Sequence, residues 1–428
     1  MNTMTIDSLA ARLEAIAGVP HVRPALPADS VDGLEPDLVV VPGTPEEVGA
    51  ILRVAGEGGL GVIPRGGGTK LAWGNRPRHA RIILSTERLA RLLEHAHGDM
   101  TATAEAGITI AALQQALAAH GQMLALDPPW PERATLGGVT AADSSGPLRL
   151  RYGTLRDLII GIGVALPDGT LAKAGGKVVK NVAGYDLMRL WTGSLGTLGL
   201  ITSLTLRLHP LPAATTTLAV DVPSPDAAEA FMQALSISPS TPTGAQIVAE
   251  GNSYTVYVRL AGVEASVAAQ TEVLLRHAKQ VGRSIGVVAE DAAAGIWTSH
   301  ETIYEDAHDA VVARFSVLPS STATTLRAIS EVAGRLGIRS RVVLQATGTG
   351  VVRLDGVHEQ ALAAGLGVLR SRVMEDRGSL VVQACPAPIK DRIDVWGQPG
   401  DAHPLMLRIK EQFDPRGIMN PGRFIGGI

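Results

Sequence analysis

A run of three glycines directly after a short apolar segment restricts the fold of this chain more than any other feature. Residues 60–63 predict a buried strand, and the sequence continues as Pro64-Arg65-Gly66-Gly67-Gly68-Thr69-Lys70. Glycine permits positive φ and close approach, so backbone N–H groups at this strand end could surround a phosphate flanked by Arg65, Thr69 and Lys70. The same pattern is also compatible with a plain tight turn.

Further segments rich in small residues follow in the same part of the chain. They are residues 134–146, the motif Lys180-Asn181-Val182-Ala183-Gly184-Tyr185-Asp186-Leu187, and residues 193–202. Such loops supply N–H and hydroxyl donors without bulky side chains. Together with the first glycine loop, they predict a binding site for a long polar ligand.

The alternation of strands and helices over residues 37–121 predicts a layered α/β domain. Helices are expected over 45–58 and 110–120, with Thr44 and Thr109 as N-caps. A β-hairpin is expected over 159–172, turning at Pro167-Asp168-Gly169. The expected strands are 37–42, 61–64, 81–84 and 101–105.

After Pro210-Leu211-Pro212 the pattern changes to strand-like runs separated by two helices, 226–235 and 263–281. This indicates an α+β cap on an antiparallel sheet, so the fold class is α+β. We expect a first domain over 1–212, the cap over 213–385, and a C-terminal segment, 386–428, that returns to the first domain. The expected cap strands are 218–222, 254–260, 311–317, 341–346, 350–354 and 379–384.

Composition excludes several classes of function. A formal charge of −3 and 3% aromatic residues give no basic, base-stacking surface, so we expect no nucleic acid partner. The single cysteine, Cys385, excludes an intramolecular disulfide and a cysteine-held iron-sulfur cluster, and we expect no metal site. Residues 1–18 predict an amphipathic helix instead of a signal peptide. We therefore expect a cytoplasmic protein that reaches the inner membrane only through partners.

The order of these motifs resembles the FAD-binding domain of the vanillyl-alcohol oxidase and p-cresol methylhydroxylase (PCMH) family, over residues 36–212 and Asn420-Pro421-Gly422-Arg423. Within it, the first glycine loop, the 180–187 motif and Phe413-Asp414-Pro415 are similar to FAD-binding E-type subunits of bacterial glycolate oxidase. The resemblance implies a PCMH-type domain of two subdomains under a cap. It also implies noncovalent FAD, because neither of the first two glycine loops contains the His or Cys that holds a covalent flavin.

The resemblance implies cofactor contacts residue by residue. The first glycine loop would hold the pyrophosphate, residues 135–146 would follow the pyrophosphate and ribityl chain, and residues 193–199 would line the adenine and flavin side. Leu195 departs from the family, which commonly has Glu there. The expected cofactor-binding residues are Arg65, Gly66, Gly67, Gly68, Thr69, Lys70, Thr135, Gly137, Gly138, Ala142, Ser145, Gly146, Gly153, Gly193, Gly196, Thr197, Gly199, Ile201 and Arg423.

The function implied by the resemblance is oxidation of glycolate, or D-lactate, to the 2-oxo acid. The implied partners are a homologous FAD-binding D-type subunit and an iron-sulfur F-type subunit that accepts electrons. Arg314, Tyr185 and Asn420 are the candidate catalytic residues. Arg314 would pair with a substrate carboxylate, whereas Tyr185 and Asn420 would approach the flavin. The structural alternatives are an edge-strand surface position for Arg314 and packing at a helix start for Tyr185.

Other readings stay open at this point. Catalytic D-2-hydroxy-acid dehydrogenases of this family carry a Gly-Asp-Gly-Asn-x-His motif that is missing here, so a partner chain could perform the oxidation. A self-sufficient FAD-dependent oxidoreductase and a scaffold subunit with a decayed flavin site are the alternatives. A nicotinamide-binding fold fits less well, because no G-x-G-x-x-G pattern with a later acidic residue follows the first strand.

Overall fold

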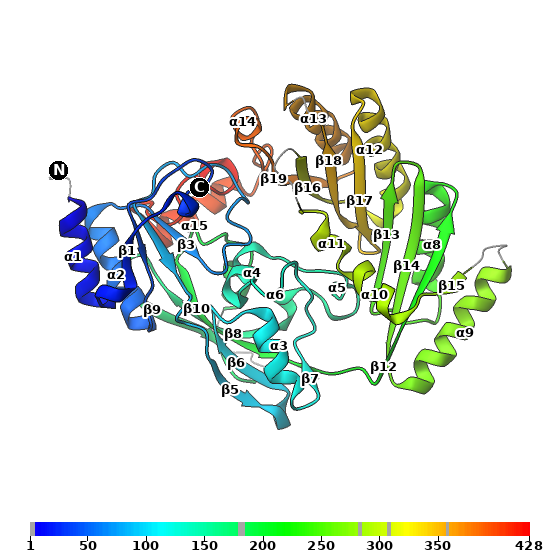
Figure 1. Cartoon of the computed structure of the whole chain (residues 1–428), viewed down its shortest axis with the longest axis horizontal. Helices are drawn as coiled ribbons and strands as arrows, with labels where there is room; N and C mark the ends of the chain where they lie inside the picture. The colour runs from blue at the N-terminus through cyan, green and yellow to red at the C-terminus, as the bar shows by residue number, and fades with distance from the viewer. Residues whose placement is uncertain (1–4, 179–184, 281–284, 306–309, 357–358) are drawn as a thin grey trace. The chain divides into compact units, whose positions relative to one another are not determined.

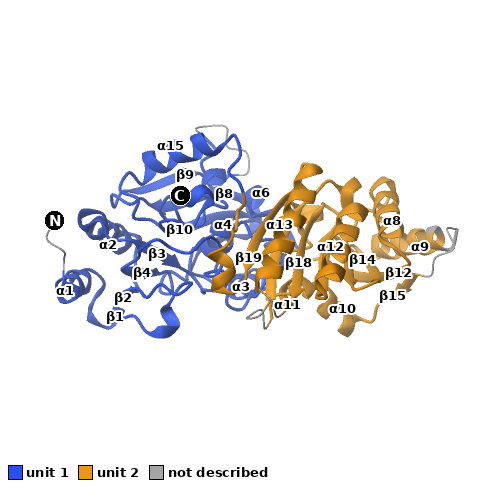
Figure 2. Ribbon diagram, turned by 90° about the horizontal axis from the view of Figure 1, so that it is seen from above, with its two compact units in different colours: residues 1–145, 154–210, 398–428 blue, residues 146–153, 211–397 orange. Residues whose placement is uncertain are grey.

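The computed structural model describes residues 5–178, 185–280, 285–305, 310–356 and 359–428. The chain divides into two compact units, coloured separately in Figure 2. Unit 1 comprises residues 1–145, 154–210 and 398–428, and unit 2 comprises residues 146–153 and 211–397. Across the described ranges, no helix has both the length and the apolar character needed to cross a bilayer.

A four-stranded sheet in the order β1-β2-β4-β3 forms one part of unit 1. Strands β2 (Leu38–Val40), β4 (Ile82–Ser85) and β3 (Val62–Arg65) are parallel, and β1 (Val22–Pro24) pairs antiparallel with β2. Strands β2 and β3 lie on either side of β4, and helix α2 (Pro45–Gly58) is the crossover that connects β2 to β3. The glycine loop begins at the carboxyl end of β3, an edge strand of this sheet.

Helix α2 begins and ends at the predicted residues. The Thr44 side chain accepts a hydrogen bond from the Glu47 N–H, and Gly59 ends the helix in the left-handed region at φ 61°. Helix α1 (Ile6–Ala17) lies beside α2 (Figure 1) and buries Leu9 and Leu13 in the core under this sheet.

A five-stranded antiparallel sheet in the order β5-β6-β10-β8-β9 forms the other part of unit 1. The predicted hairpin is confirmed, since β8 pairs with β9 around the turn at Asp168 and Gly169. The strands are β5 (Leu92–Ala96), β6 (Thr101–Glu105), β8 (Ile159–Ala165), β9 (Leu171–Gly175) and β10 (Leu200–Arg207).

Ala165 and Leu200 of the five-stranded sheet belong to the same core as α1 and α2, so the two sheets share apolar packing.

Short helices and one small sheet complete unit 1. The remaining elements are α3 (Ile110–Ala118), α4 (Leu136–Ala142), α6 (Leu155–Leu158), α7 (Met188–Trp191), α15 (His403–Phe413), and the pair β7 (Gln122–Met123) and β11 (His209–Pro210).

Unit 2 is built on one eight-stranded antiparallel sheet, as the sequence pattern predicts, in the order β15-β12-β14-β13-β17-β18-β16-β19. Its main core lies on one face of the sheet and includes residues of α8, α9, α12 and α13 (Figures 1 and 2). The strands are β12 (Ala214–Val222), β13 (Gly244–Glu250), β14 (Ser253–Gly262), β15 (Ile285–Val287), β16 (Ala310–Ser316), β17 (Arg339–Gln345), β18 (Thr349–Asp355) and β19 (Ser379–Ala384).

The longer helices of unit 2 are α8 (Pro225–Ile237), α9 (Glu264–Gln280), α12 (Thr322–Leu336) and α13 (Glu359–Glu375). The sequence pattern did not predict helices α12 and α13 or strands β13 and β15. A smaller cluster around Ile303, Val312 and Val343 covers part of the other sheet face. The shorter helices are α5 (Arg149–Tyr152), α10 (Glu290–Trp297), α11 (Ser299–Thr302) and α14 (Ala387–Lys390).

The unit boundaries differ from the expected ones at residues 146–153, 211–212 and 386–397. Residues 146–153 belong to unit 2, where Leu150 packs against the main core. Residues 386–397 also belong to unit 2, because Ile389 and Val395 are buried in that core. Residues 398–428 belong to unit 1.

Candidate functional site

A pocket in unit 1 is formed by three glycine-containing segments and the C-terminal turn. Its walls come from the loop after β3, helix α4, the segment around residues 195–201, and residues 420 and 423. The lining residues are Pro64, Arg65, Gly66, Gly67, Gly68, Thr69, Lys70, Leu71, Thr86, Thr135, Gly137, Gly138, Ala141, Ala142, Leu195, Gly196, Gly199, Leu200, Ile201, Asn420 and Arg423.

The first glycine loop has no room for side chains at Gly66 and Gly67, because it lies in close contact with the second loop. A Cβ atom on Gly66 would lie 2.0 Å from Thr135 Oγ1, and one on Gly67 would lie 1.7 Å from the Arg133 carbonyl oxygen. Within the described residues, the N–H groups of Gly66, Gly67, Gly68 and Thr69 donate to no protein acceptor. These residues line the pocket, and their amides remain available to an anionic ligand.

Helix α4 forms the second wall. Thr135 caps it by accepting a hydrogen bond from the Gly138 N–H at 3.3 Å. A Cβ atom on Gly137 would lie 2.7 Å from the Ala106 side chain, so this glycine permits the helix to lie against the end of β6. The close approach brings Gly138 and Ala142 to the pocket with almost no side-chain bulk.

The third segment is held by backbone bonds to α4. The N–H groups of Gly193 and Leu195 donate to the carbonyls of Thr140 and Ala141 at 2.9 and 2.7 Å. Leu195 has φ 51°, a left-handed conformation that a non-glycine residue rarely adopts. The family's Glu is thus replaced by a leucine whose backbone is fixed in a tight turn.

The C-terminal turn joins the pocket through Asn420. Its N–H donates to the Val62 carbonyl at 2.8 Å, and its side-chain Nδ2 donates to the Leu195 carbonyl at 2.6 Å. Asn420 is only 6% exposed, and its Oδ1 accepts no hydrogen bond from the described residues. A buried acceptor of this kind is suited to a hydroxyl or N–H of a ligand.

Arg423 brings a buried cation to the same wall. It is 1% exposed, and its Nη2 donates to the carbonyls of Leu71 and Trp73. Burial lowers the pKa of the guanidinium to about 10, and Asp32, with Oδ2 at 4.0 Å from Nη1, partly opposes that effect. The group stays positively charged at neutral pH and can offset the charge of a bound anion.

A buried ion pair secures the C-terminal turn. Lys410 Nζ lies 2.7 Å from Asp414 Oδ2 and also donates to the carbonyls of Thr197 and Met419 at 2.7 and 3.0 Å. The Asp414 carboxylate accepts in addition from the N–H groups of Ile418 and Met419 at 3.1 and 2.8 Å. Burial lowers the pKa of Lys410, and the nearby carboxylate opposes that effect.

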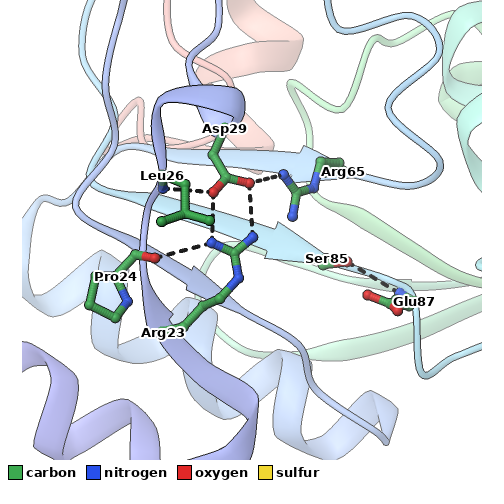
Figure 3. Close-up of polar contacts among 7 residues, drawn as sticks. All are labelled: Arg23, Pro24, Leu26, Asp29, Arg65, Ser85 and Glu87. Carbon is green, nitrogen blue, oxygen red and sulfur yellow. Dashed lines mark hydrogen bonds and ion pairs between the residues drawn. The ribbon is translucent and has the colours of Figure 1, made fainter.

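Arg65, the last residue of β3, is held by a carboxylate (Figure 3). Its Nη1 donates to Asp29 Oδ1 at 2.6 Å, and Asp29 also pairs with Arg23. The hydrogen bond from Arg23 keeps the pKa of Asp29 well below its usual range. Lys70 lies beside two aromatic rings, with Nζ 5.7 Å from the Trp73 centroid and 5.3 Å from that of Trp130.

The structure brings most of the expected cofactor residues together. Those that line the pocket are Arg65, Gly66, Gly67, Gly68, Thr69, Lys70, Thr135, Gly137, Gly138, Ala142, Gly196, Gly199, Ile201 and Arg423, together with Asn420. Others do not line it: Ser145, Gly146, Gly153, Gly193 and Thr197. Gly193 and Thr197 instead shape the turn, and Gly146 and Gly153 belong to unit 2.

Two candidate catalytic residues lie away from the lining. Tyr185 does not line the pocket and is 90% exposed, and the adjoining motif residues 180–184 lie outside the described part of the chain. Arg314 lies on β16 of unit 2, near Tyr304, whose phenol donates to Gln383 Oε1. Burial raises the pKa of Tyr304, and the charge of Arg314 partly opposes that effect.

The sequence did not predict the residues that support the pocket without lining it. Asp29 lies in Pro27–Asp29, a segment without a recognisable motif, so the neighbouring sequence does not predict its contact with Arg65. Lys410 is four residues before Asp414, a helical spacing that could have suggested their pairing.

Comparison with known proteins agrees with the pocket. Residues 36–175 match the family described as FAD binding domain, and residues 399–424 match the C-terminal domain of FAD linked oxidases. A D-lactate dehydrogenase of Archaeoglobus fulgidus is 41% identical over 189 residues, which are 44% of this chain and 42% of that protein. Glycolate oxidase subunit GlcD of Bacillus subtilis is 36% identical over 183 residues, 43% of this chain and 39% of that protein. The chain thus spans less than half the length of these curated relatives.

Solved structures agree on the fold. The structure of p-cresol methylhydroxylase with bound substrate is similar with a TM-score of 0.76 at 15% identity, covering 97% of this chain and 96% of the other. At this identity the likeness concerns the fold alone, which is of the PCMH type predicted from the sequence.

Proposed function

We propose that this chain, which carries the FAD-binding domain of the FAD-linked oxidoreductases, is the FAD-binding subunit of an enzyme that oxidises a small 2-hydroxy acid such as glycolate or D-lactate. One observation carries the proposal. The backbone N–H groups of Gly66–Thr69 donate to no acceptor in the described residues, and they share one pocket with the cations Arg65 and Arg423. The names of the two curated relatives support the substrate class.

FAD fits the residues present. The amides of the first glycine loop and the Arg65 guanidinium suit a diphosphate, and the orphaned Asn420 Oδ1 suits a donor group of the cofactor. Among the described residues that line the pocket there is no His or Cys, so the cofactor would be held noncovalently. When bound, FAD supplies hydride acceptance from an alcohol carbon and onward transfer of single electrons.

The chain's own residues then have separate tasks. Gly66 and Gly67 allow the first glycine loop to pack against the second loop beside the pocket, and Arg65 and Arg423 would offset the negative charge of the cofactor. In unit 2, Arg314 is the candidate partner of the substrate carboxylate, because a guanidinium can bind it through two parallel hydrogen bonds.

The proposed partners are a second FAD-binding subunit and an iron-sulfur subunit. This chain has one cysteine and no Gly-Asp-Gly-Asn-x-His motif, so electron acceptance by a cluster and proton removal from the substrate would rest on other chains. Such a complex would work in the cytoplasm and reach the inner membrane through its partners.

The test is anaerobic addition of glycolate or D-lactate to the FAD-loaded chain, alone and together with candidate partner subunits. Bleaching only in the presence of a partner supports the subunit role, and bleaching of the chain alone favours a self-sufficient enzyme. In whichever preparation bleaches, Arg314→Met should raise the substrate concentration needed by about tenfold or more, through loss of a charge-assisted contact. Arg339→Met, an exposed arginine of the same sheet, is the matched control.

A further inference from the structure

Asp29 occupies a central position among three segments of unit 1 (Figure 3). Its carboxylate is 5% exposed and accepts two hydrogen bonds from Arg23, at 2.7 and 3.0 Å, and one from Arg65 at 2.6 Å. The Leu26 N–H adds a fourth at 2.8 Å. A carboxylate with this many donors is held in one orientation.

Arg65 is only partly engaged by this contact. Its Nη1 donates to Asp29, while no acceptor in the described part of the chain takes a hydrogen bond from its Nε or Nη2. Arg65 also lines the pocket next to the free amides of the glycine loop. One edge of the guanidinium is therefore fixed, and the remaining donors are left for a ligand that takes two parallel hydrogen bonds, as a phosphate does.

Arg23 determines whether this arrangement attracts an anion. Asp29 by itself would cancel the charge of Arg65, whereas the three groups Arg23, Asp29 and Arg65 together carry one net positive charge. Glu87 also acts on Arg23, but it is exposed, so solvent and salt screen its effect. Arg23 does not line the pocket, and its influence on a ligand there would be electrostatic.

We propose that Asp29 is a positioning residue for the diphosphate of FAD, holding Arg65 in its binding orientation, and that Arg23 offsets the Asp29 charge. The inference rests on the FAD site of the proposed function and deepens it. It ties the segment 22–29, which precedes the FAD-binding family match at residue 36, to cofactor affinity.

A purely electrostatic role for Asp29 predicts the opposite sign. Removing a negative charge near the pocket would tighten the binding of a diphosphate if orientation did not matter. If orientation matters, Asp29→Asn weakens binding, because the Asn amide places an NH2 donor where one carboxylate oxygen accepted a hydrogen bond from an arginine. The two readings therefore separate in a single affinity measurement.

The experiment is titration of FAD into apoprotein, followed by flavin fluorescence, for wild type, Asp29→Asn, Arg65→Gln and the double variant. We expect Asp29→Asn to raise Kd by about tenfold, the usual effect of losing one charge-assisted contact. The double variant should bind no worse than Arg65→Gln, since Asp29 acts through Arg65. Asp37→Asn breaks a comparable pair with Arg81 outside the lining and should leave Kd unchanged.

Arg23→Gln supplies an independent variant at a half-exposed position, so it tests the inference even if Asp29→Asn fails to fold. It should weaken FAD binding several-fold at low salt, and the difference from wild type should shrink at high salt. Unchanged or tighter binding by Asp29→Asn and Arg23→Gln, or additive losses in the double variant, would overturn this inference alone. Failure of wild type to bind FAD would overturn the proposed function instead.

Discussion

The side-chain amide of Asn420 donates a 2.6 Å hydrogen bond to the backbone carbonyl of Leu195, joining positions 225 residues apart in the sequence. Both residues have left-handed backbone conformations, with φ of 46° and 51°. The contact therefore links two tight turns that line the same pocket. The C-terminal turn is part of the candidate cofactor site, and the site depends on contacts that span the whole chain.

Loss of the Asn420 side chain should weaken FAD binding. Asn420→Gly keeps the left-handed backbone but removes both the bond to Leu195 and the buried acceptor Oδ1, so we expect Kd to rise by about tenfold. Titration with FAD measures this change. Arg377→Gly, at an exposed left-handed position in unit 2, is the control and should bind like wild type. Equal FAD affinity of the two variants would contradict a role of the Asn420 side chain in cofactor binding.

Adding one methyl group to the first glycine loop should separate it from the second. A Cβ atom at Gly67 would lie 1.7 Å from the Arg133 carbonyl oxygen, so Gly67→Ala must displace the loop. We expect FAD retention to fall by at least tenfold while the far-ultraviolet circular dichroism stays close to that of wild type. Gly98→Ala meets nothing within 4 Å and should be neutral. Normal FAD binding by Gly67→Ala would contradict the close packing of the two loops.

The Lys410–Asp414 pair should matter for stability. Asp414→Asn leaves Lys410 buried without its counter-charge, and breaking one partner of such a pair costs about 3–5 kcal/mol. Urea unfolding of the apoprotein should show a clearly lower midpoint. The pair of Asp226 and Arg327 has the same 2.7 Å separation but is exposed and screened by solvent, so Asp226→Asn should lower the midpoint far less. Similar urea midpoints for Asp414→Asn and Asp226→Asn would contradict the claim that the buried pair contributes more to stability than the exposed pair.

Acid should remove the contribution of Asp29. Its pKa in the folded protein lies below that of an unfolded aspartate, about 3.9, so the folded state is favoured wherever the carboxylate is ionised in both states. The stabilisation is complete above about pH 5 and declines as the pH falls toward the folded pKa. The difference in Tm between wild type and Asp29→Asn should therefore shrink from pH 6 to pH 3. A difference that is constant over this range would contradict the pairing.

Elements with strong local signals were predictable from the sequence. Helix α2 has a Thr cap, a proline in its first turn and a glycine after its end, and both of its ends were predicted. The β8–β9 hairpin has an Asp-Gly turn. The glycine loop was recognisable because further segments rich in small residues follow it in the same part of the chain.

Other elements depend on tertiary packing and were missed. Helix α13 contains Gly365, where a Cβ atom would lie 2.5 Å from Leu336, so a residue that weakens a helix locally is required for contact with α12. Helix α12 begins with a Thr-rich segment and gains its stability from buried Leu326 and Ile329. Asp29 and Lys410 support the site through contacts with Arg65 and Thr197, which lie 36 and 213 residues away in the sequence.

The central claim is that the pocket of unit 1 binds FAD without a covalent bond. The most direct measurement is the visible spectrum of the purified chain after addition of FAD and removal of excess, before and after acid precipitation. We predict oxidised-flavin bands that stay with the folded protein and pass entirely into the supernatant on precipitation. A colourless protein after FAD addition would contradict the claim of binding, and flavin retained in the pellet would contradict noncovalent attachment.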